Sequence, residues 1–226
     1  MKDEELSIYD FGNFQIWQSD RLMKVSTDSL LLAGYCKNLS FTQVLDIGCG
    51  IGVITFILSS YEPTAQCIGV DVQSEAIQIA QKSKVLNSDI TNIDFIHCDI
   101  QNYSSSKRFD LIVSNPPYYV NQLRAINILR DEFRHTDNNF VEKFANSCKN
   151  LSSDTGQIVI IIPLNMEALW SREMSQKGFI LNELVLLKFQ NNSDNLVVIC
   201  KYSSTDLSFV RREWVYGESN NNISKI

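Results

Sequence analysis

Short apolar runs and longer segments of helical period alternate along most of the chain. The apolar runs are strand-sized and rich in Ile and Val, and they lie at 44–47, 66–70, 93–97, 109–114 and 157–162. The segments of helical period between them lie at 52–60, 74–86 and 140–151. This alternation is typical of β-α-β units, so we predict an α/β fold built on a largely parallel sheet.

The pattern changes at both ends of this region. After the last of these strands, a helical segment over 164–177 precedes two strands, 179–189 and 196–202, which a polar turn joins. Strands joined directly by a turn run antiparallel, so the sheet should be mixed at one edge. Near the N-terminus, apolar and polar residues alternate over 11–17 around a Gly-Asn pair, which predicts a small hairpin or lid strand, and a helix follows from about 28 to 36.

Length and composition favour one domain. The chain has 226 residues, 44% of them hydrophobic and 20% charged, and no Pro-, Gly- or Ser-rich linker divides it. A domain of roughly 150 residues is the usual size, and larger single domains are common. We therefore expect one domain over 1–226, with a hairpin and helix over 1–40, a core over 41–202 and a polar extension over 203–226 with a mobile tip.

Membrane and metal-binding functions find no support in the sequence. No apolar run approaches the roughly 18 residues of a membrane span, and the acidic first residues are unlike a secretory signal. The six cysteines are scattered without a C-x-x-C pair, and there are only two histidines. The sequence thus predicts a cytoplasmic protein with free thiols, no metal and no membrane contact.

The net charge first argues against a nucleic-acid substrate. There are 20 Lys and Arg residues against 26 Asp and Glu residues, a formal charge of −6. Binding of nucleic acid by bulk electrostatics requires a Lys or Arg for each neutralised phosphate. However, 121–149 and 201–226 each carry one more basic than acidic residue. A local positive patch therefore keeps a nucleic-acid substrate possible, with modest and salt-sensitive affinity.

A glycine loop follows the first strand of the core. The run Asp46-Ile47-Gly48-Cys49-Gly50-Ile51-Gly52 differs from the G-x-G-x-x-G pattern that binds a dinucleotide pyrophosphate. Glycines permit a tight turn and let the backbone approach a ligand closely. Asp71 ends the next strand, where a ribose-binding carboxylate sits in such folds, and Asp99 follows the third strand. All three features should line one crevice at the carboxyl ends of the strands.

This combination resembles the S-adenosylmethionine site of class I methyltransferases. The resemblance implies a Rossmann-like three-layer sandwich with a mostly parallel seven-stranded sheet and an antiparallel edge strand. It also implies that the backbone at Gly48 and Gly50 holds the methionine part of the cofactor, and that Asp71, with Val72 beside it, binds the ribose hydroxyls. Asp99 and the Ile100 backbone would read the adenine. For Asp46, a direct contact and an orienting role both remain open.

The run Asn115-Pro116-Pro117-Tyr118 follows the fourth strand and reaches the same crevice. Two consecutive prolines end the strand and stiffen the backbone. An exocyclic amine is a poor nucleophile while its lone pair is delocalised into a ring or amide. The Asn115 side-chain oxygen and the Pro116 carbonyl can accept its two N–H groups and favour a pyramidal nitrogen, while Tyr118 can stack on the planar group. The motif indicates N-methylation of adenine, cytosine, guanine or a glutamine amide.

A second resemblance narrows the substrate. The segment Met23-Lys24-Val25-Ser26-Thr27-Asp28, with the apolar helix after it, is similar to M-K-V-G-T-D in the bacterial methyltransferases that modify the adenine just 3′ of the anticodon in valine tRNA. Ser26 replaces the usual glycine. The resemblance implies that Lys24, Thr27 and Asp28 help close the cofactor pocket and that the N-terminal hairpin and helix cap it. It also implies that RNA meets Pro117, Tyr118, Arg124, Arg130 and Arg134.

Other functions stay open at this point. A glutamine N5-methyltransferase acting on release factors shares N-P-P-Y, but its family has a sizeable helical domain before the glycine loop, where this chain has 43 residues. A ribosomal guanine-N2 methyltransferase is disfavoured because Phe is commoner there after N-P-P. A binding protein without chemistry, a DNA methyltransferase and an NAD-dependent dehydrogenase are weaker alternatives. We expect a monomer.

Overall fold

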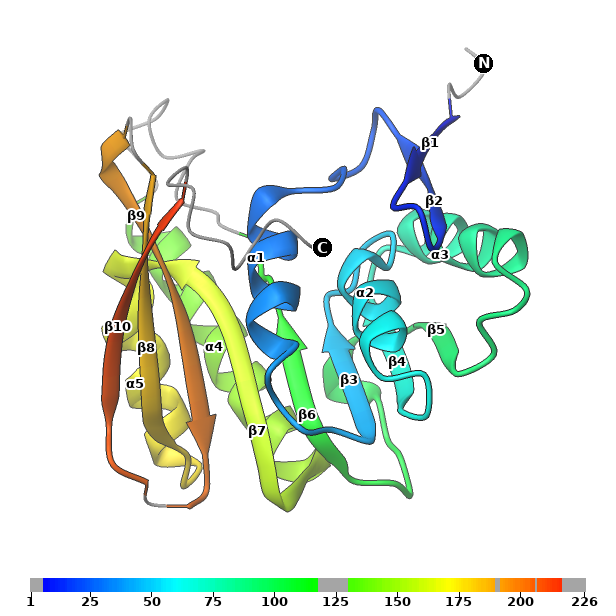
Figure 1. Cartoon of the computed structure of the whole chain (residues 1–226). Helices are drawn as coiled ribbons and strands as arrows, with labels where there is room; N and C mark the ends of the chain where they lie inside the picture. The colour runs from blue at the N-terminus through cyan, green and yellow to red at the C-terminus, as the bar shows by residue number, and fades with distance from the viewer. Residues whose placement is uncertain (1–5, 118–129, 190–191, 206, 217–226) are drawn as a thin grey trace.

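The computed structural model describes residues 6–117, 130–189, 192–205 and 207–216 (Figure 1). Within these ranges the main sheet has eight strands in the order β10-β8-β9-β7-β6-β3-β4-β5. They are β3 (Gln43–Ile47), β4 (Gln66–Asp71), β5 (Ile93–His97), β6 (Phe109–Ser114), β7 (Ser152–Pro163), β8 (Ile180–Phe189), β9 (Asn192–Ser203) and β10 (Val210–Tyr216). Only β9 is antiparallel to its neighbours, β7 and β8. The predicted α/β class with a mostly parallel, mixed sheet is confirmed.

Helices cover both faces of this sheet and make three layers (Figure 1). One layer holds α1 (Thr27–Cys36), α2 (Val53–Tyr61) and α3 (Ser74–Leu86), and the other holds α4 (Arg130–Leu151) and α5 (Glu167–Gln176), with short 3-10 turns at Ile100–Asn102 and Leu164–Met166. Successive strand residues point to opposite faces, so Val44 joins the core under the first layer and Leu45 the core under the second. No helix in the described ranges is long and apolar enough to cross a membrane.

The eighth strand corrects the expectation of seven. β10 lies within 203–226, which the sequence presented as a polar extension, and it pairs in parallel with β8. Its residues are mostly exposed because it is the last strand at that end of the sheet. Among residues 210–215, whose exposure is described, only Trp214 turns partly inward, with its ring 5.8 Å from that of Tyr35. Polar composition therefore concealed an edge strand. The tip of this extension, which the sequence predicts to be mobile, lies outside the described residues.

The predicted N-terminal hairpin is confirmed. Strands β1 (Leu6–Asp10) and β2 (Gln15–Ser19) pair antiparallel as a separate sheet. The hairpin attaches to α3, because the backbone N–H of Gln15 donates to Asn87 Oδ1 at 2.9 Å and that of Trp17 donates to Ser83 Oγ at 2.9 Å. The Lys82 ammonium also lies 4.2 Å from the Trp17 ring centroid. These contacts use backbone donors that an edge strand would otherwise leave unpaired.

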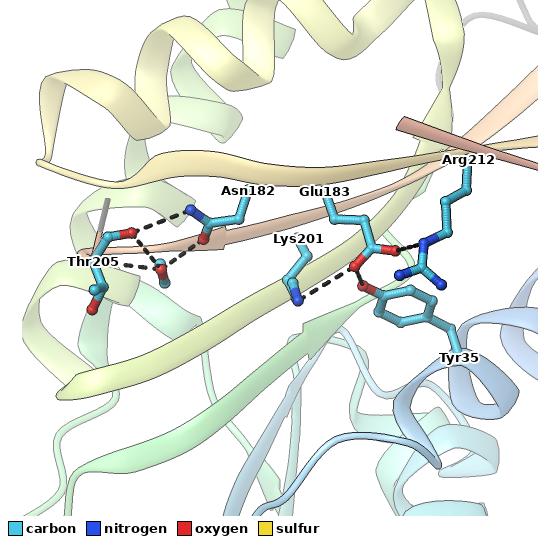
Figure 2. A network of polar contacts seen from close by, with 7 residues as sticks. Tyr35, Asn182, Glu183, Lys201, Thr205 and Arg212 are labelled. Carbon is cyan, nitrogen blue, oxygen red and sulfur yellow. Dashed lines mark hydrogen bonds and ion pairs between the residues drawn. The ribbon is translucent and has the colours of Figure 1, made fainter. Parts of the chain in front are cut away.

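A polar cluster joins α1 to the C-terminal strands, as Figure 2 shows. The Glu183 carboxylate on β8 is 8% exposed; it accepts a hydrogen bond from the Tyr35 hydroxyl and forms an ion pair with Arg212 Nε, both at 3.0 Å. Lys201 on β9 pairs with it at 3.4 Å. A buried charge needs such partners, since an uncompensated one is costly. The cluster thereby fixes α1 against β8, β9 and β10.

Candidate active site

The predicted motifs gather where the strand order of the sheet reverses. From β3 the chain builds outward to β4 and β5 on one side, and later to β6 and β7 on the other. The carboxyl ends of β3 and β6 therefore flank a topological switch point, where open α/β sheets bind ligands. Gly48 follows β3, and Asn115 follows β6. The Ser114 hydroxyl donates to the Ile47 carbonyl at 2.8 Å and holds the two strand ends together.

The glycine loop has a conformation that favours glycine. Gly48, Gly50 and Gly52 have φ values of 72°, 55° and 90°. A Cβ at Gly48 or Gly50 would meet nothing within 4 Å, whereas a Cβ at Gly52 would lie 2.6 Å from Phe95. The first two glycines thus border open space that a ligand can enter. Gly52 is needed for packing, where α2 begins.

Asp71 fastens this loop to the end of β4. Its Oδ2 accepts the Gly50 N–H and its Oδ1 accepts the Gln73 N–H, both at 2.8 Å. Each carboxylate oxygen has a further lone pair, so Asp71 can also accept hydrogen bonds from a pair of hydroxyls. Val72, next along the chain, is 65% exposed, so its side chain is available for an apolar contact.

Asp99 lies at the end of the neighbouring strand. It caps the 3-10 turn that begins at Ile100, accepting the Gln101 N–H at 3.0 Å. The Gln101 side-chain amide also contacts both of its oxygens, at 3.2 and 3.1 Å. The Ser147 hydroxyl of α4 reaches the Ile100 carbonyl at 3.4 Å. The start of the turn is therefore held by Asp99 and by α4.

Asp46 lies under the glycine loop rather than in the crevice. It is fully buried, and its Oδ2 accepts the backbone N–H of Thr55 at 3.1 Å and the Thr55 hydroxyl at 2.7 Å. Its Oδ1 has no partner among the described residues. Burial, with the charge of Asp71 adding to it, raises the pKa of Asp46 to about 7, although the Thr55 hydrogen bonds oppose the shift. Because Asp46 has no exposed surface, an orienting role is favoured over a direct contact with the cofactor.

Asn115 is held by the first turn of α1. Its side-chain Nδ2 donates to Ser29 Oγ at 3.0 Å, and Ser29 Oγ also accepts from Ser26 Oγ at 3.0 Å. Ser26 caps α1 by accepting the Ser29 N–H at 3.2 Å. Pro116 is buried and Pro117 is exposed. Ser29, itself supported by Ser26, thus connects α1 to the loop after β6.

The remaining predicted cofactor-binding residues lie at the start of α1 or just before it. Thr27 begins α1 and is exposed, Asp28 lies in its first turn, and Lys24 forms an ion pair with Asp20. Some predicted substrate-binding residues cannot be placed: Tyr118 and Arg124 lie outside the described residues, and so do the side chains of Arg130 and Arg134 on α4.

Sequence reasoning missed two residues of the site, Ser29 and Thr55. Each side chain is engaged by a partner that belongs to another element of the chain, Asn115 for Ser29 and Asp46 for Thr55. No spacing rule could have paired them, although Ser29 follows the Thr27-Asp28 motif directly. Among the described residues, no group of His, Cys, Asp and Glu could hold a metal ion, and all six cysteines are unpaired.

Residues of the crevice fit S-adenosylmethionine. Open space adjoins Gly48 and Gly50, a carboxylate stands at the end of β4, and an amide stands at the end of β6 beside them. The solved structure of M. jannaschii TYW2 in complex with AdoMet has the same fold, with a TM-score of 0.63, 14% identity, and coverage of 90% of this chain and 88% of that one. The methyltransferase small domain model matches residues 22–167. Fold and site together define a class I, S-adenosylmethionine-dependent methyltransferase.

Individual relatives narrow this class. A tRNA1(Val) (adenine(37)-N6)-methyltransferase of Pedobacter heparinus is 34% identical over 157 residues, which cover 69% of this chain and 67% of the relative. A protein of the same name from Pseudoalteromonas translucida is 27% identical over 220 residues, covering 97% of this chain and 94% of the relative. The chain belongs to the family of the bacterial tRNA1(Val) (adenine(37)-N6)-methyltransferases.

Proposed function

We propose that the protein transfers a methyl group from S-adenosylmethionine to N6 of adenine 37 in a valine tRNA. The observation that carries the proposal is the Asn115 amide, held beside the glycine loop at the switch point of the sheet. The names of the relatives supply the choice of tRNA and of adenine. A base in an anticodon loop is already partly exposed, so its extrusion into the site costs little.

The catalytic residues in this proposal are Asn115, Pro116 and Tyr118. The Asn115 side-chain oxygen and the Pro116 carbonyl accept the two N–H groups of the adenine amine, and Tyr118 stacks on the ring. When bound, S-adenosylmethionine supplies a methyl group on a positively charged sulfur, which leaves as a neutral thioether. The amine nitrogen forms the new bond and then loses a proton to solvent, so no strong base is required.

The residues proposed to hold the cofactor lie at the ends of β3, β4, β5 and β6 or near the start of α1. The Gly48 and Gly50 backbone faces its methionine part, Asp71 accepts from its ribose, and Asp99 reads its adenine. Asp46 supports the glycine loop from below, because it binds Thr55 in the first turn of α2. The rest of the proposed pocket consists of Lys24, Thr27, Asp28, Val72, Ile100 and Asn115, whose main role is toward the target amine.

The residues proposed to contact RNA follow β6 in the sequence. We assign the substrate side to Pro117, Tyr118, Arg124, Arg130 and Arg134, and we expect the protein to act as a monomer. Because neutralised phosphates release counterions, the affinity for tRNA should fall as salt rises. In bacteria such a substrate is found in the cytoplasm, where we place the protein.

The decisive experiment offers labelled S-adenosylmethionine with four separate substrates: unmodified valine tRNA, a release factor, ribosomal RNA and DNA. Label in the tRNA, recovered after digestion as N6-methyladenosine, is the expected result. Label in the release factor or in ribosomal RNA alone would contradict the proposal and indicate a glutamine or guanine methyltransferase instead.

A variant separates binding from chemistry. Asn115→Ala should keep its affinity for S-adenosylmethionine, measured by calorimetry, and lose transfer, because Asn115 serves the target amine. Near-normal turnover by Asn115→Ala would show that the mechanism is wrong.

A further inference from the structure

Ser29 is a buried serine at the start of α1 that no sequence motif assigned to the site. It is 9% exposed, and its hydroxyl oxygen accepts two hydrogen bonds, from Asn115 Nδ2 and from Ser26 Oγ, each at 3.0 Å. Ser26 is itself fixed by accepting the Ser29 N–H at the helix cap. Ser29 Oγ is therefore held in place as an acceptor for the Asn115 amide.

This contact decides which edge of the amide faces the crevice. A carboxamide is planar, with its oxygen and nitrogen on opposite edges, and the last side-chain torsion of Asn has two broad minima that exchange these edges. In the structure the nitrogen edge lies on Ser29. The oxygen edge consequently points away from α1. If the nitrogen edge of Asn115 faced the crevice instead, its N–H groups would oppose the N–H groups of an approaching amine, and no hydrogen bond could form.

We infer that Ser29 is a positioning residue for methyl transfer: its hydroxyl holds Asn115 Nδ2, so that the Asn115 oxygen is presented to the target amine. This inference rests on the role proposed above for Asn115. The hydrogen bond also polarises the amide, which makes its oxygen a better acceptor. Ser26 contributes by donating to Ser29, which gives a role to the serine that replaces the usual glycine of the segment.

The chain offers a matched control in α2. Ser59 is 2% exposed, and its hydroxyl has no partner among the described residues. Ser29→Ala and Ser59→Ala thus make the same chemical change inside a buried helix, but only the first removes a contact to Asn115. Ser29→Thr keeps a hydroxyl at the site and serves as the rescue variant.

The kinetic experiment uses the substrate that takes the label in the four-substrate assay. Ser29→Ala should lower kcat about ten-fold, the effect of one lost hydrogen bond, while the KM for S-adenosylmethionine stays within about two-fold of wild type. Ser29→Thr should restore most of the rate. A Ser29→Ala enzyme as fast as Ser59→Ala would overturn the inference and leave the proposed function standing.

A second measurement, NMR spectroscopy of the Asn115 side chain, needs no substrate. The side-chain amide resonances of Asn115, assigned by their loss in Asn115→Ala, should shift and exchange faster with solvent in Ser29→Ala but not in Ser59→Ala. Unchanged resonances would refute the contact itself. Label in a substrate other than tRNA would overturn the proposed function alone, and no label in any of the four would overturn both.

Discussion

Asp46→Asn should alter how stability depends on pH. Asp46 is fully buried beneath the glycine loop, and only one of its oxygens has a partner among the described residues. Burial is the main reason why its pKa is raised to about 7. The folded protein thus holds a proton on Asp46 at pH values where the unfolded chain has lost it.

The sign and size of the effect follow from this difference. An Asp in the unfolded chain has a pKa of about 3.9, so stability is highest while Asp46 is protonated in both states and is lost as pH rises from about 4 to about 7. The complete loss is about 4 kcal/mol, of which roughly 2–3 kcal/mol falls between about pH 5 and pH 8. The neutral Asn side chain cannot titrate, so the variant lacks this loss.

Urea unfolding of wild type and Asp46→Asn at about pH 5 and pH 8, at constant ionic strength, measures the effect. The free energy of unfolding of the variant, relative to wild type, should rise by roughly 2–3 kcal/mol between the two pH values. Contributions from all other titrating groups cancel in this comparison. A relative stability that does not change with pH would show that Asp46 is ionised in the folded protein.

Three further substitutions test other parts of the structure. Gly52→Ala should destabilise the fold by about 2 kcal/mol or more, seen as a lower Tm, because φ is 90° and the new Cβ would lie 2.6 Å from Phe95. Asp71→Ala should weaken S-adenosylmethionine binding in calorimetry by more than about ten-fold, because the Gly50 N–H loses its acceptor. Glu183→Ala should reduce the free energy of unfolding by about 2 kcal/mol, since partly buried Lys201 then lacks its carboxylate; an unchanged urea midpoint would argue against that role.

Sequence patterns predicted the parts of the fold that are repetitive. The strands that end at Ile47, Asp71, His97 and Ser114 are short and rich in apolar residues, and most of their residues are buried, so their boundaries could be read closely from the sequence. β10 escaped because one neighbour supplies its hydrogen bonds and most of its side chains face solvent, which leaves no apolar run. Composition alone does not distinguish such a strand from a tail.

Candidate site residues were predicted in position but not in their contacts. Strand spacing placed Asp71 and Asn115 at the correct edge of the sheet, because parallel strands end together. The partners of Asn115 and Asp46 depend on how α1 and α2 pack, which no local pattern encodes. Ser29 is 86 positions from Asn115 along the chain, and their contact exists only once the sheet has formed.

Ion pairing also changes which segment we expect to contact the proposed tRNA substrate. The sequence count treated 201–226 as slightly positive and able to face RNA. In the structure, however, Lys201 and Arg212 pair with Glu183, and Lys201 is only 17% exposed. The Glu183 carboxylate offsets one of these two positive charges, and Lys201 is poorly placed to neutralise a phosphate as well, whereas the Arg212 side chain is 61% exposed. If the substrate is tRNA, as proposed, we expect most of the phosphate contacts to come from 121–149, the other segment counted as having an excess of basic residues.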